Sequence, residues 1–268
     1  MKELIVRALS GLLYVSIIIM AMYAAPQWFI GLVLVLGLIT IYEFQKLVNL
    51  KQLLPYLLLI VLMYITAYDP IHPKWIMLYA ILCIAVNLYL LKEVLNPKAQ
   101  LDALWIKYVV LCFYLIGGFV MLALIPFSVG GQFDPRPIIG VFILIWANDS
   151  FAYLIGKSMG RHKLLERISP KKTIEGFVGG LVGSMLASIV IFNYTELYSL
   201  SIWLLLAVMI SVLGTFGDLI QSKFKRNAGV KDSGTIMPGH GGIYDRLDSI
   251  IYTSPFIYLF LELAEHVS

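Results

Sequence analysis

The sequence predicts an all-α, polytopic integral membrane protein, and three observations lead to this class. Hydrophobic residues make up 60% of the 268 residues, and charged residues only 13%. A soluble domain usually has about 25% charged residues, because its surface faces water. The apolar residues are gathered into stretches of about twenty, the length of a helix that crosses a bilayer. Lys and Arg lie mainly between those stretches.

Nine apolar stretches can be distinguished along the chain. A hydrocarbon core about 30 Å thick requires about 20 mostly apolar residues per helix. The third stretch is shorter, and Pro55 near its start is compatible with a first helical turn. We therefore expect about nine transmembrane helices, over residues 5–25, 27–45, 53–68, 75–92, 104–126, 137–156, 173–192, 201–220 and 247–265.

The first stretch has the basic start of a signal peptide, because Lys2 and Arg7 precede an apolar run. However, the run is long, and Pro26 follows its small-residue end, where cleavage is disfavoured. We expect a retained transmembrane helix here.

The positive charges indicate which side of the membrane each connection faces. If the N-terminus and the connections after spans 2, 4, 6 and 8 share one side, that side holds 18 of the 20 Lys and Arg residues. Only Lys74 and Arg136 lie on the other side. Short connections rich in Lys and Arg face the cytoplasm. We therefore expect a cytoplasmic N-terminus, a C-terminus on the opposite side, and cytoplasmic loops at 157–172 and 221–246.

The chain shows no soluble domain and no convincing internal repeat. We divide it into an N-terminal region of spans 1–4, residues 1–100, and a C-terminal region of spans 5–9, residues 101–268. The C-terminal region holds both basic loops and the polar motifs. We expect the catalytic chemistry there.

The strongest functional pattern runs from Gly214 to Asp248, and Asp218 is its first acidic residue. A carboxylate near the middle of a membrane costs about 2.5–3.5 kcal/mol on insertion scales, and it usually faces a polar interior with a partner. At helical spacing, Asp218 shares a face with Gln221 or Ser222 and with Lys225. An interfacial Asp218 paired with a nearby lysine is the structural alternative.

Asp245 and Asp248 lie three positions apart at the start of the last stretch, so on a helix they share a face. Two such carboxylates repel each other unless a cation or a proton intervenes. Capping of the helix dipole is the alternative for this pair. Mg²⁺ commonly takes one or two carboxylates and completes its shell with phosphate oxygens and water. We expect a metal site at Asp218, Asp245 and Asp248.

The residues between these carboxylates are basic or rich in glycine. Cations can hold phosphate groups, and glycines let backbone N–H groups approach an anion. Taken singly, glycines simply form loops, and a histidine is more often structural than catalytic. The candidates for substrate binding in this segment are Ser222, Lys223, Lys231, His240, Gly241, Gly242 and Arg246, and Lys225 and Arg226 are candidate catalytic residues.

A second polar group begins in the sixth stretch with Asn148 and Asp149. Asp149, Tyr153 and Lys157 recur at every fourth position, so they line one helical face that descends to the first basic loop. We expect Asn148, Asp149 and Tyr153 to contribute to a substrate cavity.

The end of that loop predicts a helix start. Ser169 is expected to cap the seventh stretch, with Pro170 at the first position and Lys171 and Lys172 in the opening turn. Cations there oppose the helix dipole, which indicates an anion such as a nucleotide phosphate at this N-terminus. Basic residues that act only as topology anchors are the alternative for both lysines.

Four glycines in the seventh stretch predict close helix packing, because small residues let transmembrane helices approach each other. These are Gly176, Gly179, Gly180 and Gly183.

Residues 222–248 resemble the signature of the phosphatidate cytidylyltransferase family, also called CDP-diacylglycerol synthases. The stretches 148–153 and 169–176 also resemble family motifs, whereas residues 1–100 match mainly as generic membrane helices. Met237 stands where the family pattern usually has Leu, Ile or Phe. The matching positions are Ser222, Phe224, Lys225, Arg226, Lys231, Asp232, Gly234, Pro238, His240, Gly241, Gly242, Ile243, Asp245, Arg246, Leu247 and Asp248.

The resemblance implies a Mg²⁺-dependent transfer of CMP from CTP to phosphatidate, with CDP-diacylglycerol and pyrophosphate as products. A second metal ion or a monovalent ion is left open. The implied partners are CTP, phosphatidate, the lipid bilayer and a second copy of the chain in a homodimer, with no nucleic acid. The implied location is the cell (inner) membrane, with the active site at the cytoplasmic face. In this reading Lys225, Arg226, Lys171 and Lys172 hold phosphate groups.

Two other functions remain as alternatives. A CTP-dependent kinase of a polyprenyl or phytyl alcohol would share the helices, the nucleotide site and the metal, but it would transfer the γ-phosphoryl group. An ion-coupled transporter would use intramembrane aspartates and glycine-interrupted helices. The polar residues gather near one face and not in the middle of the bilayer, which disfavours the transporter.

Overall fold

The computed structural model describes residues 2–68, 73–96, 101–239 and 241–267. The nine predicted stretches correspond to helical segments within three residues at each end, except that the eighth, α9, continues to Asn227, seven residues beyond its predicted end. In chain order the elements are α1 (Lys2–Ala24), α2 (Pro26–Leu47), α3 (Leu54–Tyr68), α4 (Pro73–Leu95), α5 (Leu104–Val109), the π-helical segment η1 (Val110–Ile116), α6 (Gly117–Leu124), the 3-10 turn η2 (Ile125–Phe127), α7 (Arg136–Met159), β1 (Lys163–Leu165), β2 (Ser169–Thr173), α8 (Ile174–Thr195), α9 (Leu200–Asn227) and α10 (Tyr244–Val267).

Seven helices in the described ranges are long and apolar enough to cross a membrane, which confirms the predicted all-α polytopic class. Two further apolar helices are shorter, Leu9–Ala24 within α1 and the whole of α3. The 15 residues of α3 extend about 22 Å at 1.5 Å per residue, less than the hydrocarbon core of about 30 Å. The seven long helices are Pro26–Leu47, Pro73–Leu95, Leu104–Phe127, Arg136–Met159, Ile174–Thr195, Leu200–Asn227 and Tyr244–Glu265.

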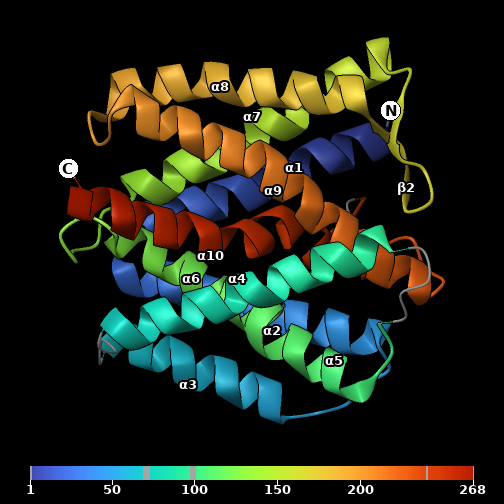
Figure 1. Cartoon of the computed structure of the whole chain (residues 1–268), viewed down its shortest axis with the longest axis horizontal. Coiled ribbons are helices and arrows are strands. Elements are labelled where there is room, and N and C mark those ends of the chain that lie inside the picture. Colours follow the sequence, from blue (N-terminus) through green and yellow to red (C-terminus); the bar gives the residue numbers. More distant parts are fainter. Residues whose placement is uncertain (1, 69–72, 97–100, 240, 268) are drawn as a thin grey trace.

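The ends of the helices follow the predicted alternation. The start of α1, the β1–β2 hairpin and the connection from α9 to α10 lie at one end of the molecule, and the end of α10 lies at the other (Figure 1). The two loops richest in Lys and Arg therefore share an end. The assignment of that end to the cytoplasm stays a prediction.

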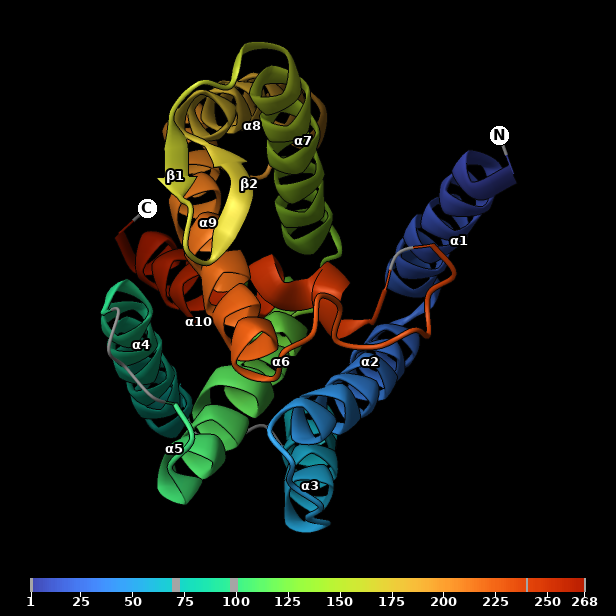
Figure 2. The same cartoon turned by 90° about the vertical axis from the view of Figure 1, so that its right-hand side faces the viewer.

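The continuous helix 104–127 lies at the centre of one half of the molecule, where α2, α3, α4 and α10 pack against it (Figure 2). Leu111, Tyr114 and Phe119 on this helix are fully buried. The helix widens to a π-helical turn at Val110–Ile116. The Tyr79 hydroxyl on α4 donates a hydrogen bond to the Cys112 carbonyl in that turn, at 2.7 Å. A side chain of the neighbouring helix thus satisfies a backbone carbonyl where the regular pattern is interrupted.

The predicted start of the seventh span is wrong. Ser169–Thr173 form strand β2, which pairs antiparallel with β1, so Lys171 and Lys172 lie in an extended strand and not in a helical turn. The helix begins at Ile174, and Thr173 is its N-cap, because its Oγ1 accepts a hydrogen bond from the Gly176 N–H at 3.1 Å. Pairing with β1 keeps residues 169–173 extended, so Thr173, and not Ser169, caps the helix. The argument from the helix dipole therefore does not apply to the two lysines.

The four glycines of α8 pack against α7, as predicted. A Cβ atom at Gly179 would lie 2.6 Å from the side chain of Ile155, and one at Gly180 would lie 2.8 Å from the Asn148 Oδ1. A Cβ atom at Gly183 would overlap the Phe151 ring. This close contact fixes the face of α7 that carries Asn148 and Asp149 relative to α8 and α9.

Candidate active site

A cavity of about 580 Å³ lies among α7, α8, α9, α10 and the β1–β2 hairpin. It collects predicted residues from segments up to a hundred positions apart. Charged side chains come from α7, the β1–β2 hairpin, α9, α10 and the connection between α9 and α10, whereas α8 contributes Gly176 and Phe177. The predicted site residues that line the cavity are Asn148, Asp149, Tyr153, Lys171, Lys172, Asp218, Lys225, Asp245, Arg246 and Asp248.

Asp218 projects from α9 into this cavity and has two partners. The Lys172 Nζ from strand β2 lies 2.5 Å from its Oδ2. The Ser222 hydroxyl, one turn further along α9, donates a hydrogen bond to its Oδ1 at 3.1 Å. Both ends of the Lys172–Asp218 pair are about 30% exposed, so the pair faces the cavity and remains open to exchange with a ligand.

Asp248 on α10 and Asp149 on α7 bring two more carboxylates to the same cavity. The Asp248 Oδ1 accepts a hydrogen bond from the Ser249 backbone N–H at 2.7 Å, and within the described ranges Asp248 makes no ion pair. Asp149 has a long contact of 3.5 Å with the Asn148 amide. Asp149, Asp218 and Asp248 thus place three carboxylates around one cavity. Like charges brought together in this way favour a bound cation.

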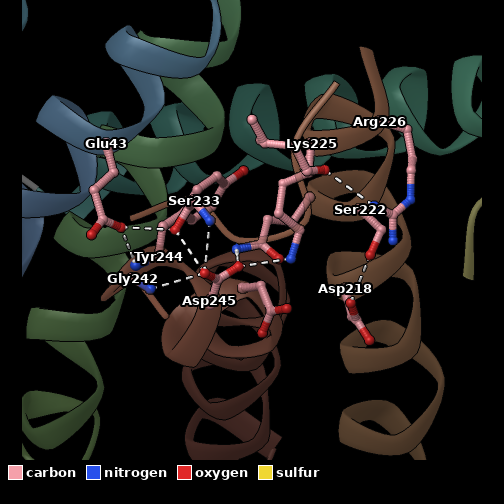
Figure 3. A network of polar contacts seen from close by, with 12 residues as sticks. Glu43, Asp218, Ser222, Lys225, Arg226, Ser233, Gly242, Tyr244 and Asp245 are labelled. Atoms are coloured by element: carbon pink, nitrogen blue, oxygen red, sulfur yellow. Dashed lines mark hydrogen bonds and ion pairs between the residues drawn. The ribbon is translucent and has the colours of Figure 1, made fainter. Parts of the chain in front are cut away.

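Asp245 has a different environment, although it also borders the cavity. Its Oδ1 accepts hydrogen bonds from the Lys225 Nζ at 2.7 Å and from the Gln221 amide at 3.1 Å. Its Oδ2 accepts the Ser233 N–H at 2.8 Å, the Ser233 hydroxyl at 3.0 Å and the Gly242 N–H at 2.9 Å (Figure 3). Its side chain is only 4% exposed. Oδ1 of Asp245 thus holds two side chains of α9, and Oδ2 holds the loop between α9 and α10.

The predicted metal site can be compared with this geometry. Among the described residues, no three His, Cys, Asp or Glu side chains are grouped closely enough to hold a metal ion. Mg²⁺ needs only one or two protein carboxylates when phosphate and water complete its shell. Asp218 and Asp248 fit that requirement, because both line the cavity and neither is saturated with donors. Asp245 fits less well, since five donors already surround it. The metal site stays a prediction.

The predicted cations divide into two groups. Lys171, Lys172, Lys225 and Arg246 line the cavity. Arg226 does not, because its guanidinium donates to the carbonyls of Ile168 and Val230 and ties the two basic loops together. Lys223 is buried outside the cavity near Arg167 and Glu93, and Lys231 is exposed outside it.

The remaining predicted residues lie around the cavity and not in its wall. Ser222 holds Asp218. Gly241 has a φ of +86°, which favours glycine, and its carbonyl accepts the Met237 N–H. Gly242 donates its N–H to Asp245. His240 lies outside the described residues.

The comparison with known proteins assigns the chain to a family. The model of the cytidylyltransferase family matches residues 5–264. The chain belongs to the cytidylyltransferase family. The family model thus covers the N-terminal helices, which the sequence motifs alone left as generic spans.

Three curated relatives of this cytidylyltransferase-family chain, all from staphylococci, are each named phosphatidate cytidylyltransferase. The protein of Staphylococcus haemolyticus (strain JCSC1435) is 50% identical over 126 residues, which are 46% of this chain and 48% of the relative. The protein of Staphylococcus aureus (strain N315) is 47% identical over 126 residues, with the same coverage. The protein of Staphylococcus saprophyticus is 46% identical, again over 126 residues. The chain thus spans about half the length of the curated relatives it matches.

The structure adds residues of this family member that the sequence patterns did not single out. Asp232 lines the cavity, although it was noted only as a signature position. Thr215 and Ser249 line it as well, and small hydroxyl residues in a span give no distinctive signal. Glu43 on α2 accepts hydrogen bonds from the backbone of Ile243 and Tyr244, in the signature segment 222–248, about 200 positions away in sequence. An acidic residue within an apolar span was the signal that could have identified it.

Proposed function

We propose that this cytidylyltransferase-family protein is a phosphatidate cytidylyltransferase, which transfers CMP from CTP to phosphatidate in phospholipid synthesis. The observation that carries the proposal is the cavity, where carboxylates of three helices meet Lys171, Lys172, Lys225 and Arg246. Both substrates are polyanions, and one of them carries acyl chains that stay in the bilayer. A charged cavity within a bundle of apolar helices suits that combination. The names of the staphylococcal relatives agree with it.

The reaction needs charge neutralisation and alignment more than a proton acceptor. A phosphate oxygen of phosphatidate attacks the α-phosphorus of CTP, the bond from that phosphorus to the bridging oxygen breaks, and pyrophosphate leaves. A phosphate monoester is already anionic near neutral pH, so no general base is needed, and positioning and electrostatic stabilisation supply the acceleration.

The residues of the cavity can be assigned to these tasks. Lys172, Lys171 and Arg246 would hold substrate phosphates, and Lys225, fixed by Asp245, would face the departing pyrophosphate. Asn148, Asp149 and Tyr153 would shape the wall on α7. Mg²⁺ held by Asp218 and Asp248 would neutralise the negative charge of the CTP phosphates.

The orientation and assembly belong to the same proposal. The basic connections would lie in the cytoplasm, the location would be the cell membrane, and CTP would enter the cavity from the cytoplasm. The protein would act as a homodimer. The clustering of the N-terminal start of α1 and both long basic loops at one end of the molecule supports the orientation.

Product analysis tests the reaction. Purified protein in detergent–phosphatidate micelles is incubated with Mg²⁺ and CTP labelled at either the α- or the γ-phosphorus. We expect the α-label in the lipid extract and the γ-label in pyrophosphate. A γ-label in the lipid, with polyprenyl alcohol as acceptor, would instead identify the kinase alternative. Solute movement in vesicles without pyrophosphate release would favour the transporter.

A further inference from the structure

Glu43 is a carboxylate within an apolar helix, and it is 1% exposed. It lies on α2 and forms no ion pair in the described part of the chain. It accepts three hydrogen bonds from the signature segment, the Ile243 N–H at 3.1 Å, the Tyr244 N–H at 2.9 Å and the Ser233 hydroxyl at 2.9 Å. A buried carboxylate in a span is expensive, so a side chain retained there usually has a specific task.

The position of Glu43 is that of a helix cap supplied by another helix. Tyr244 is the first residue of α10, and the first N–H groups of a helix have no partner within it. Glu43 supplies acceptors to two consecutive N–H groups at this N-terminus, where a negative charge is also favoured by the helix dipole. Asp245 supplies the acceptor for the preceding N–H, that of Gly242. Two carboxylates together therefore hold the start of α10.

Ser233 joins the two carboxylates. Its hydroxyl lies 2.9 Å from the Glu43 Oε2 and 3.0 Å from the Asp245 Oδ2 (Figure 3). One hydroxyl hydrogen is shared by the two acceptors, so the positions of Glu43 and Asp245 depend on each other. Asp245 in turn holds the Lys225 Nζ at 2.7 Å, and Lys225 lines the cavity.

Two signature glycines are explained by the same contact. A Cβ atom at Gly234 or at Gly242 would overlap the carboxylate of Glu43. Gly242 does not have a positive φ, so space, and not backbone conformation, requires glycine there. The signature segment is thus shaped to fit around a residue of the N-terminal half of the chain.

From these contacts we infer that Glu43 is a positioning residue of the active site, which holds the loop and the start of α10 so that Asp245 and Lys225 are aligned at the cavity. Glu43 itself does not line the cavity, so it acts through these residues and not on the substrate. Its effect on catalysis rests on the proposed function, whereas its effect on the loop does not.

The test compares Glu43→Gln and Glu43→Ala with Thr40→Val in full-length protein. Gln has nearly the same shape but only one acceptor oxygen, and its amide group would face an N–H donor. Thr40 lies on the same helix, is fully buried and has a hydroxyl without a hydrogen-bond partner in the described structure, so it controls for altered packing of α2. We expect at least a tenfold loss of kcat and at least a threefold rise of the KM for CTP in Glu43→Ala, a smaller change of both in Glu43→Gln, and wild-type values in Thr40→Val.

The KM separates positioning from loss of folded protein, because unfolded enzyme lowers the apparent kcat and leaves the KM unchanged. Amide hydrogen exchange is measured on the same samples, and the amides of residues 243 and 244 should exchange at least tenfold faster in Glu43→Gln than in wild type. A KM for CTP within twofold of wild type in both Glu43 variants, or unchanged exchange at these amides, would overturn the inference. If wild-type protein forms no CDP-lipid, the proposed function fails, and the exchange rates alone decide the role of Glu43.

Discussion

Lys172 on strand β2 forms an ion pair with Asp218 on α9 across the wall of the cavity, with the Nζ 2.5 Å from the Oδ2. The pair joins the β1–β2 hairpin to a transmembrane helix. If a metal ion bound Asp218 and a phosphate bound Lys172, each side chain would exchange this ion pair for a contact with a ligand. Under the proposed function, the hairpin would thus carry a cation that moves from a protein carboxylate to a substrate phosphate.

We predict that Lys172→Ala lowers kcat/KM for CTP by at least a factor of 30, because a charge-assisted phosphate contact contributes about 2 kcal/mol. Lys172→Arg should recover part of the activity. Arg161→Ala removes an exposed cation near the same hairpin without touching the cavity, and it should remain within twofold of wild type. Initial-rate kinetics on the three variants provide the measurement. Equal losses in Lys172→Ala and Arg161→Ala would indicate a general effect of positive charge.

Asp245 and Asp248 should respond differently to the same substitution. Asp248→Asn should lower turnover at least a thousandfold and leave the melting temperature within about 2 °C of wild type, because the Asp248 carboxylate accepts a hydrogen bond from the Ser249 N–H that an Asn side chain can also accept. Asp245→Asn should lower turnover and also reduce the free energy of unfolding by about 3 kcal/mol. The loss of stability follows because the nearly buried Lys225 is left without its charged partner. Activity assays and thermal unfolding in detergent separate the two. Similar melting temperatures for both variants would contradict the distinction.

The helices could be predicted from the sequence because the bilayer imposes a length and a polarity on each span. The faces of α9 were harder to assign. Arg226 lies one position after Lys225, yet it binds the Ile168 and Val230 carbonyls, whereas Lys225 lines the cavity. Periodicity places both near the membrane boundary, but only the packing of neighbouring segments decides which one lines the cavity.

The hairpin and Glu43 were missed for different physical reasons. Residues 163–173 are too short and too polar to give a strand signal, and Ser169-Pro170 imitates a helix start. Glu43 acts through hydrogen bonds to residues about 200 positions away, and no local pattern encodes that contact. Asp218 and Asp248 both line the cavity, and each lies within a span that the apolar pattern had already located.

The packing of α8 against α7 gives a prediction about stability. Gly183→Ala should destabilise the protein by about 1–3 kcal/mol, because the added Cβ atom would overlap the Phe151 ring and force the helices apart. Gly31→Ala is the matched control, since nothing lies within 4 Å of a Cβ atom at that position on α2. That variant should be unchanged or slightly stabilised, because alanine is the better helix former. Thermal unfolding of both variants in one detergent decides, and equal melting temperatures would contradict the close packing.

Removal of divalent ions tests the metal site. Excess EDTA should abolish turnover, and added Mg²⁺ should restore it. The five cations that line the cavity face five carboxylates, so they leave little net positive charge to neutralise the CTP phosphates. Binding can be followed without turnover by the rise in melting temperature that Mg²⁺ causes in the presence of CTP, since a ligand that binds only the folded state stabilises it. Asp218→Asn and Asp248→Asn should each reduce this rise. Glu196→Gln should preserve it, because Glu196 follows the last residue of α8 and does not line the cavity. Full turnover in EDTA, or an equal rise in all variants, would exclude these aspartates as the metal ligands.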